Sequence, residues 1–362
     1  MKLTPFDYGL ARFSHTLAAP LRNMGEAESL FLEKKLADLT IDRPIFITGL
    51  ARSGTTILLS ILSSIPGVAT HRYRDFPFLM TPYFWNRLQN LFSREEQPVE
   101  RPHQDRIRIT RESPDAFEEP LWHHFFPHLH DPGKNHLLDA SQESPEFERF
   151  FVDHLKKIVL IRGGQRYLSK GNYNLTRIAY LAKLFPDARF LVPVRDPVSH
   201  VHSLVRQHCL FEGYAQSDPR VPHYLEAAGH FEFGPQRVPI HLSRSRTNDI
   251  LGAWQGGDDY RGYAMLWADL YGYLDDLMAR EESLAHQIRL VRFEQLCQDP
   301  GGEMQKNLAF AELEGKGAAY AKSVAAISPP PPGTLSAVTD REREMIWQET
   351  GVVAAKLGYH PL

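Results

Sequence analysis

Residues 44–56 read Pro-Ile-Phe-Ile-Thr-Gly-Leu-Ala-Arg-Ser-Gly-Thr-Thr and predict a buried strand, a glycine-bounded loop and the start of a helix. The loop and the first helical turn would present unpaired backbone N–H groups, to which the helix dipole adds positive potential. Gly49 and Gly54 let the backbone approach an anion closely, because neither residue has a Cβ atom. Their spacing is that of a phosphate loop, although Thr55 stands where nucleoside triphosphatases carry a lysine. We therefore predict a phosphate-binding loop whose cation is moved forward to Arg52.

The composition is typical of a soluble globular protein, since 43% of the 362 residues are hydrophobic and 23% are charged. The net charge of −3 gives no support for nucleic acid as a partner, and no pattern indicates the oligomeric state. Two cysteines, Cys209 and Cys297, are too few for a disulfide framework. We find neither a signal-type apolar segment nor eighteen consecutive apolar residues, so we expect a cytoplasmic protein without a membrane span.

Strands alternate with helices after the loop. Residues 167–170 and 189–194 are predicted as short strands, and residues 287–292 as a later one. A helix follows each of the first two, with Asn174 as a capping residue in one case and Pro197 in the first turn in the other. This alternation predicts an α/β fold of the phosphate-loop (P-loop) type, with a parallel sheet flanked by helices.

We expect a single domain that carries one helical, aromatic-rich insertion. The insertion covers residues 76–164, is broken by prolines, shows no clear sheet pattern and is expected to cap the site. Its aromatic residues include Tyr83, Phe84, Trp85, Phe117, Trp122, Phe125 and Phe126. The other parts are an N-terminal helical arm, a nucleotide-binding core in two pieces and a C-terminal helical tail, over residues 1–42, 43–75 with 165–310, and 311–362. In the tail we expect two short helices, over about 339–349 and 351–357.

Three predicted strands end in a cation, namely Arg52, Lys170 and Arg195. Ligands of open parallel sheets bind beyond the carboxyl ends of the strands. A single cation at such a place is usually a solvated loop residue, but three cations that follow three strands indicate a polyanionic ligand.

Several of these segments resemble motifs of the sulfotransferases that use 3′-phosphoadenosine 5′-phosphosulfate (PAPS). Residues 49–56 resemble the loop that binds the 5′-phosphosulfate in that family, although Arg52 replaces the lysine of the cytosolic members. Arg195-Asp196-Pro197, with Ser203 eight positions after Arg195, resembles the motif for the 3′-phosphate. Residues 170–175 and 291–296 resemble, more weakly, a lysine segment and a late strand of bacterial and Golgi-type members.

The resemblance implies transfer of a sulfuryl group from PAPS to a hydroxyl or amine on a small molecule, a carbohydrate or a lipid. Such transfer is in-line and relies mainly on cations and loop amides, here Arg52 and Lys170. Because sulfate carries less charge than phosphate, no metal is expected to be required. The residues expected to hold the PAPS cosubstrate are Arg52, Ser53, Gly54, Thr55, Thr56, Arg195 and Ser203.

An acceptor hydroxyl needs a general base, and the candidates are His71 and Asp75. In protein-tyrosine and glycosaminoglycan relatives a carboxylate at about this distance past the loop has this role, and in cytosolic relatives a histidine has it. The alternative for Asp75 is a surface ion pair with Arg72 or Arg74, and the alternative for His71 is an ordinary loop position.

The insertion also contains clustered polar residues. Pro127 interrupts any helix among the histidines, and their spacing matches no standard zinc site, so we predict no metal there. Glu118 and Glu119 are expected on a solvated face, with a role in acceptor binding as the alternative. The cluster comprises His123, His124, His128, His130 and Asp131.

Two rival functions stay open at this point. An ATP-dependent phosphoryl-transfer enzyme would share the loop, but Thr55 in place of its lysine argues against it. A catalytically silent nucleotide-binding module would bind the nucleotide and have no usable base near Asp75.

Overall fold

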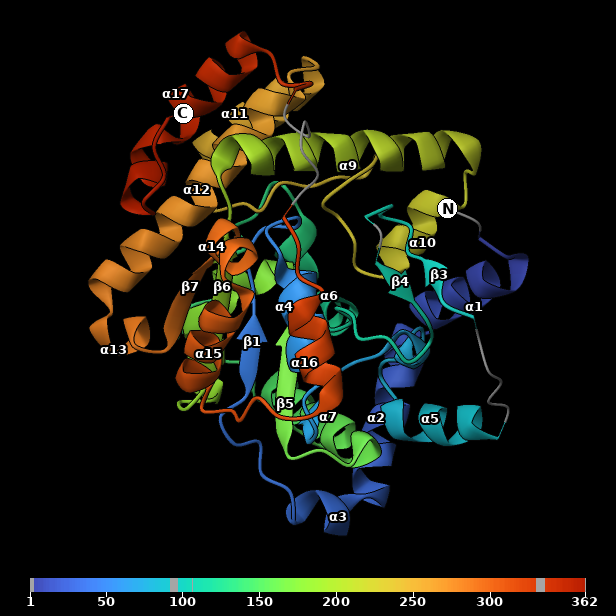
Figure 1. Ribbon diagram of the computed structural model, residues 1–362. Helices are drawn as coiled ribbons and strands as arrows, with labels where there is room; N and C mark the ends of the chain where they lie inside the picture. The colour runs from blue at the N-terminus through green and yellow to red at the C-terminus, as the bar shows by residue number, and fades with distance from the viewer. Residues whose placement is uncertain (1–2, 92–96, 106, 330–335, 362) are drawn as a thin grey trace.

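Five parallel strands form the central sheet of the computed structural model, which describes residues 3–91, 97–105, 107–329 and 336–361. The sheet order is β2-β5-β1-β6-β7, so the strand before the phosphate loop lies in the middle (Figure 1). This confirms the predicted fold class. In sheet order, the strands are Val68–Ala69, Arg166–Lys170, Ile45–Ile47, Arg189–Val194 and Ile288–Arg292.

The register brings the predicted functional segments to one edge of the sheet. Ile47, the last residue of β1, pairs with Lys170 on β5 and with Leu191 on β6. Because these strands are parallel, the residues that follow each of them leave the sheet on the same side. The phosphate loop therefore lies between the segment after β5 and the segment after β6.

Helices cover both faces of the sheet (Figure 1). Ile45 and Ile47 pack into one core with Leu58, whereas Phe46 faces the other core and stacks on Phe190. Buried strands of this kind are apolar on both sides, as parallel sheets require. The first face carries α4, α14, α15 and α16, at Thr55–Leu62, Phe293–Gln298, Pro300–Ala311 and Ala318–Ala325. The second face carries α7 and α8, at Pro145–Arg162 and Ile178–Leu184, with η3 (Asn172–Arg177) leading into α8.

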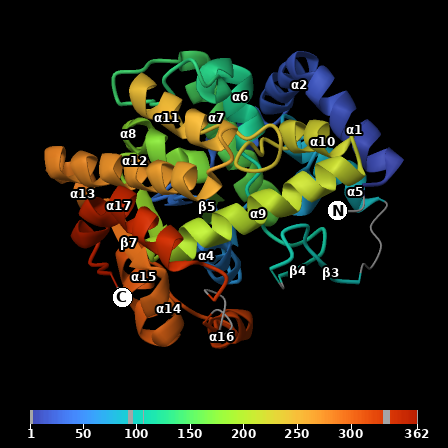
Figure 2. The same cartoon turned by 90° about the horizontal axis from the view of Figure 1, so that it is seen from above.

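A long helix, α9 (Pro197–Ser217), crosses the carboxyl edge of the sheet (Figures 1 and 2). It starts where predicted, because Asp196 accepts a hydrogen bond from the Ser199 amide at 2.8 Å and Pro197 occupies the first turn. The helix runs further than the predicted end near Cys209. Packed on α9 are α10, α12 and α17, at Val221–Ala227, Asp259–Arg280 and Asp340–Lys356. Two further helices, α11 and α13, pack on α12, at Arg244–Gln255 and Glu282–Ala285.

One expectation for the tail is wrong, because α17 runs unbroken through Gly351. Ile346 and Ala354, on either side of that glycine, are fully buried. Packing of α17 on α12 and α9 therefore outweighs the cost of about 1 kcal/mol for a glycine inside a helix.

The remaining elements belong to the N-terminal arm and the insertion. A short antiparallel pair, β3 with β4, interrupts the otherwise helical insertion. Sequence patterns did not predict this pair of strands. No helix among the described residues has the length and apolar character needed to cross a membrane. In chain order these elements are α1, α2, α3, η1, α5, β3, β4, α6 and η2, at Pro5–Thr16, Ala18–Phe31, Glu33–Ala37, Tyr73–Asp75, Pro82–Asn90, Val99–Glu100, Arg108–Ile109, Glu119–Phe125 and Pro127–His130.

Candidate active site

The phosphate loop turns sharply at three left-handed positions. Gly49 and Gly54 have φ of 147° and 112°, and Arg52 has φ of 70°, which is uncommon for a residue with a side chain. A Cβ atom on Gly54 would lie 2.9 Å from the ring of Phe293, the first residue of α14. Only glycine therefore fits at that position, and α4 begins directly after it with its unpaired N–H groups at the loop.

Arg52 joins the loop to two other parts of the chain. Its Nε donates to Ser203 Oγ on α9 at 3.3 Å, and its Nη1 donates to Asp105 Oδ2 at 2.7 Å. Burial lowers the pKa of Arg52, and the Asp105 charge opposes that shift. The structure thus brings together Arg52 and Ser203, which are 151 positions apart in the sequence.

Arg195 is a buried cation beside the same loop. Its side chain lies over the Phe293 ring, with 5.0 Å from Cζ to the ring centroid, and its Nη1 donates to the Arg52 carbonyl at 3.3 Å. Its Nε is buried without a hydrogen-bond partner, and no carboxylate among the described residues lies within 4.0 Å. A buried guanidinium with an unsatisfied donor is suited to an anionic ligand.

Glu294 holds the backbone next to Arg195 in place. One oxygen, Oε1, accepts from the Asp196 amide at 3.0 Å, and the other, Oε2, accepts from the Tyr359 hydroxyl at 2.8 Å. The Tyr359 hydroxyl oxygen also lies 3.1 Å from the Val194 carbonyl oxygen. The carboxyl ends of β6 and β7 and the end of the tail are thereby fixed to one another.

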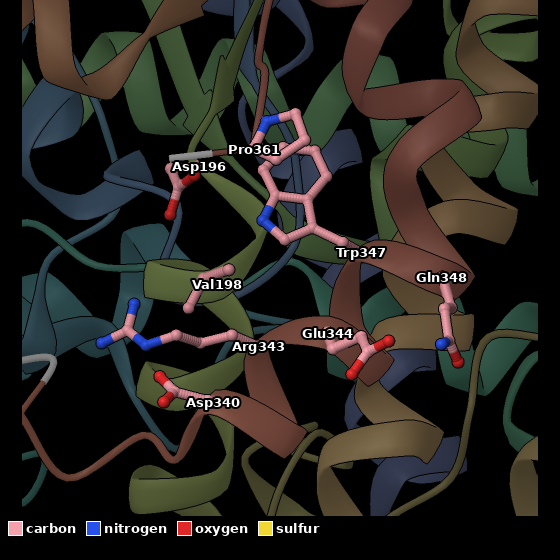
Figure 3. Close-up of a pocket in the computed structure, with 8 residues that line it drawn as sticks. All are labelled: Asp196, Val198, Asp340, Arg343, Glu344, Trp347, Gln348 and Pro361. Carbon is pink, nitrogen blue, oxygen red and sulfur yellow. The ribbon is translucent and has the colours of Figure 1, made fainter.

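Beside this corner, a cleft of about 540 Å³ lies between α17 and the start of α9 (Figure 3). Its walls include Asp196, Val198 and Trp347, together with charged side chains of α17. The cleft adjoins the segment that carries Arg195 and belongs to the same edge of the sheet.

Lys170 lies on the other side of the loop, at the end of β5. Its Nζ is 3.3 Å from Oδ1 of Asp115, whose Oδ2 accepts a hydrogen bond from the Tyr73 hydroxyl. Burial alone would raise the pKa of Asp115, but the charges of Lys170 and Arg101 hold it well below its usual range. Sequence reasoning missed Asp115, which lies in the insertion and follows no motif.

The insertion also contacts the loop through Arg101 and Asp105. Arg101 Nε donates to Asp105 Oδ1 at 2.9 Å, and its Nη1 lies 3.4 Å from Thr56 Oγ1. This segment is tied to α9, because Tyr214 donates to the Pro102 carbonyl at 2.9 Å. Asp105 therefore lies between two guanidinium groups at the mouth of the loop, an arrangement that no local pattern signals.

Asn172, which follows Lys170 closely, connects the loop to the segment after α10. Its Nδ2 donates to Glu232 Oε1 at 2.9 Å, and its Oδ1 lies 3.5 Å from Thr55 Oγ1. Although burial opposes it, hydrogen bonds from His230 and Asn172 lower the pKa of Glu232 to about 2. Glu232 is thus a fixed anion near the start of α4.

His71 and Asp75 form an enclosed cluster. Asp75 is 0% exposed and accepts from Arg162 at 2.5 and 2.6 Å and from Asn86 at 2.9 Å. His71 lies 3.4 Å from Asp75 and 3.0 Å from His154 Nε2. Burial opposes the shift, but hydrogen bonding to His71 and the charge of Arg162 lower the pKa of Asp75 well below its usual range.

Among the described residues, no hydrogen bond or ion pair joins the side chains of this cluster directly to the phosphate loop, Lys170 or Arg195. The backbone does connect it to the site, because the His71 carbonyl accepts a hydrogen bond at 3.3 Å from the amide of Asp115, the partner of Lys170. The surface ion pair considered for Asp75 is not formed either, because Arg72 and Arg74 both bind Glu112. In this structure the His71 and Asp75 side chains are thus paired with Arg162, Asn86, His154 and one another.

Glu118 and Glu119 are buried, so the expectation of a solvated face is wrong. Glu119 accepts from Arg177 at 2.7 and 2.8 Å and lies 2.6 Å from His130, and Glu118 accepts from the Tyr167 hydroxyl. Within the ranges that the structure describes, no three His, Cys, Asp or Glu side chains gather closely enough to hold a metal ion.

Comparison with known proteins agrees with this arrangement. A sequence model described as the sulfotransferase family matches residues 44–233, just over half of the chain, and the match includes the loop, Lys170, Arg195 and Ser203. The crystal structure of sulfotransferase STF1 from Mycobacterium tuberculosis H37Rv has the same fold, with a TM-score of 0.51 and 15% identity over 95% of this chain and 87% of that one.

Two curated relatives are similar in sequence over part of their length. Protein-tyrosine sulfotransferase 1 of Mus musculus is 26% identical over 174 residues, 47% of this chain and 36% of that protein. Omega-hydroxy-beta-dihydromenaquinone-9 sulfotransferase Stf3 of Mycobacterium tuberculosis (strain CDC 1551 / Oshkosh) is 25% identical over 264 residues, 64% of this chain and 65% of that protein. The chain thus spans about a third of the first relative and just under two thirds of the second. From the matched family and the shared fold, we conclude that the chain belongs to the sulfotransferase family.

Proposed function

We propose that this protein transfers a sulfuryl group from PAPS to a hydroxyl or amine acceptor. The observation that carries the proposal is the placement of Arg195, a buried guanidinium with an unsatisfied Nε, next to Arg52 and the phosphate loop. Two separate anion sites on neighbouring strand ends match a nucleotide with phosphate at both the 3′ and the 5′ position. A nucleoside triphosphate would place its charge in one chain of phosphates.

The loop amides, Arg52, Thr55 and Thr56 would hold the 5′-phosphosulfate at the start of α4. Arg195 and Ser203 would hold the 3′-phosphate, the arginine through charge-assisted bonds. Ser203 Oγ lies 3.3 Å from Arg52 Nε, so the residues proposed for the 3′-phosphate adjoin those proposed for the 5′-phosphosulfate. The remaining cation, Lys170, lies on the opposite side of the loop, where β5 pairs with β1.

In the reaction, a lone pair of the acceptor oxygen or nitrogen forms a bond to sulfur. The bond between sulfur and the bridging oxygen breaks, and its electron pair stays on the 5′-phosphate of the departing adenosine 3′,5′-bisphosphate (PAP). Cations around the phosphosulfate stabilise the charge that develops on this oxygen.

The acceptor class is a small molecule, a carbohydrate or a lipid. Among the relatives, one is named for protein tyrosine and one for a menaquinone-derived lipid alcohol, so the family accommodates different hydroxyl groups. We expect the insertion, residues 76–164, to contact the acceptor, because it supplies Asp115, the carboxylate paired with Lys170. Incubation of the protein with labelled PAPS and a cell extract would identify what becomes sulfated.

PAP without magnesium is expected to raise the melting temperature of the protein. A ligand that binds only the folded state stabilises it, by about 2.7 kcal/mol at one hundred times its Kd. Differential scanning fluorimetry with PAP, with AMP and with ATP plus magnesium checks this. A shift with ATP and magnesium but none with PAP would favour the phosphoryl-transfer alternative, in which Thr55 replaces the usual lysine.

Asp105→Asn is expected to tighten PAP binding about tenfold, as measured by calorimetry. The Asp105 carboxylate occupies Arg52 and Arg101, so the 5′-phosphate of the nucleotide must compete with it for the same cations. Glu112→Gln is the matched control: it removes the same charge from the same insertion, but Glu112 binds Arg72 and Arg74. Weaker binding in Asp105→Asn would show instead that the carboxylate positions Arg52.

A further inference from the structure

The sheet order gives the nucleotide a direction. Arg195 follows β6, the phosphate loop follows β1 and Lys170 follows β5, and these three strands are neighbours in that order. With its 3′-phosphate at Arg195 and its phosphosulfate at the loop, the nucleotide would point its sulfuryl group toward β5. In-line transfer then requires the acceptor to approach from the Lys170 side.

Asp115 is the carboxylate on that side. Its Oδ1 lies 3.3 Å from Lys170 Nζ and accepts from the Ala116 amide at 2.8 Å, and its Oδ2 accepts from Tyr73. The Asp115 side chain is 8% exposed and that of Lys170 is 7% exposed. The pair is thus shielded from bulk water without being sealed, which suits a group that exchanges a proton with a bound substrate.

The other three candidate carboxylates are bound to other partners. Asp105 binds Arg52 and Arg101, the cations that the phosphosulfate itself needs. Glu232 is fixed by Asn172 and His230, and Asp75 is enclosed by Arg162 and His71. Asp115 alone among these four is paired with the cation on the acceptor side.

We propose that Asp115 is the general base that takes the proton from the acceptor, an inference that rests on the proposed sulfuryl transfer. As the acceptor oxygen bonds to sulfur, its proton passes to a carboxylate oxygen of Asp115. The sulfur to bridging-oxygen bond breaks, and PAP leaves with the electron pair. Lys170 turns from Asp115 toward the transferring group, which removes the paired cation from Oδ1, while Tyr73 and the Ala116 amide keep the carboxylate in position.

The test measures transfer from labelled PAPS to water and to a series of phenols of decreasing acidity. Asp115→Asn keeps the shape of the side chain and removes the proton acceptor. We expect its PAP affinity to stay within about threefold of the wild type and its transfer rate to fall about a hundredfold to a thousandfold. The loss should grow as the phenol becomes less acidic, because a less acidic hydroxyl depends more on a base. Glu112→Gln is the control and should match the wild type.

Equal losses for all phenols would show that Asp115 only positions Lys170, and an unchanged rate would remove it from the reaction; either result overturns the proposal. If Asp115→Asn folds poorly, the double variant Lys170→Met with Asp115→Asn, compared with Lys170→Met, repeats the test without an unpaired cation. A wild-type protein that binds no PAP and releases no sulfate from PAPS would refute the sulfotransferase proposal first, before any variant is compared.

Discussion

Arg52→Ala should lower the rate of sulfuryl transfer about a hundredfold or more, the scale for loss of one transition-state electrostatic contact. Arg52 belongs to the loop itself, and its left-handed backbone directs the side chain toward Ser203 and the mouth of the loop. Negative charge develops there on the bridging oxygen as the bond to sulfur breaks. The measurement is the single-turnover rate with labelled PAPS at saturating nucleotide, which separates the chemical step from binding.

Arg206→Ala is the control for Arg52→Ala. Arg206 is an exposed residue of α9 whose charge acts on Arg52, but within the described part of the chain it forms no hydrogen bond or ion pair with the loop. Its removal changes the local potential without removing a contact. We therefore expect the transfer rate to change less than about threefold, as for most screened surface charges. Near-normal turnover in Arg52→Ala would place that side chain outside the reacting centre.

Arg195→Ala should weaken PAP binding by roughly 2–3 kcal/mol, the scale of a lost hydrogen bond to a charged group. AMP binding should hardly change, because AMP has no 3′-phosphate. The buried Nε of Arg195 has no partner within the described residues, so the full contact is available to a ligand. Calorimetric titration of both nucleotides into the variant and the wild type gives the comparison.

Arg189→Ala is the matched control for Arg195→Ala. Arg189 is the first residue of the same strand, β6, and pairs with Glu312 at the opposite end of the sheet. It should leave the affinity of both nucleotides unchanged. Equal losses of PAP and AMP in Arg195→Ala would mean that Arg195 recognises something other than the 3′-phosphate.

The parts of the fold that depend on short-range patterns could be predicted. Residues 44–56 carry a strand, two glycines and a helix start within thirteen positions, and the structure forms each of them there. The strand at 189–194 and the helix start at Pro197 are equally local, since an apolar run and a capping residue define them. Strand β2 escaped prediction, because two residues are too few to show a pattern.

Contacts between distant segments could not be predicted in the same way. Asp115 meets Lys170 across 55 positions and Asp105 meets Arg52 across 53, and neither residue has a characteristic neighbourhood in the sequence. For Asp75, its distance from the loop predicts a general base, but the sequence does not show which side chains pair with it. Arg162, from α7, lies 87 positions away and makes Asp75 part of the core.

During synthesis, β1 leaves the ribosome well before either of its partner strands exists. The nearer partner in sequence, β5, begins about 120 residues later, which at about 5–20 residues per second is a wait on the order of ten seconds. Ile45, Phe46 and Ile47, all 0% exposed in the finished sheet, stay unpaired for that time. An apolar strand with free edges associates readily with other chains. Strand β1, which leads into the phosphate loop, is thus a segment to which a chaperone of nascent chains would be expected to bind.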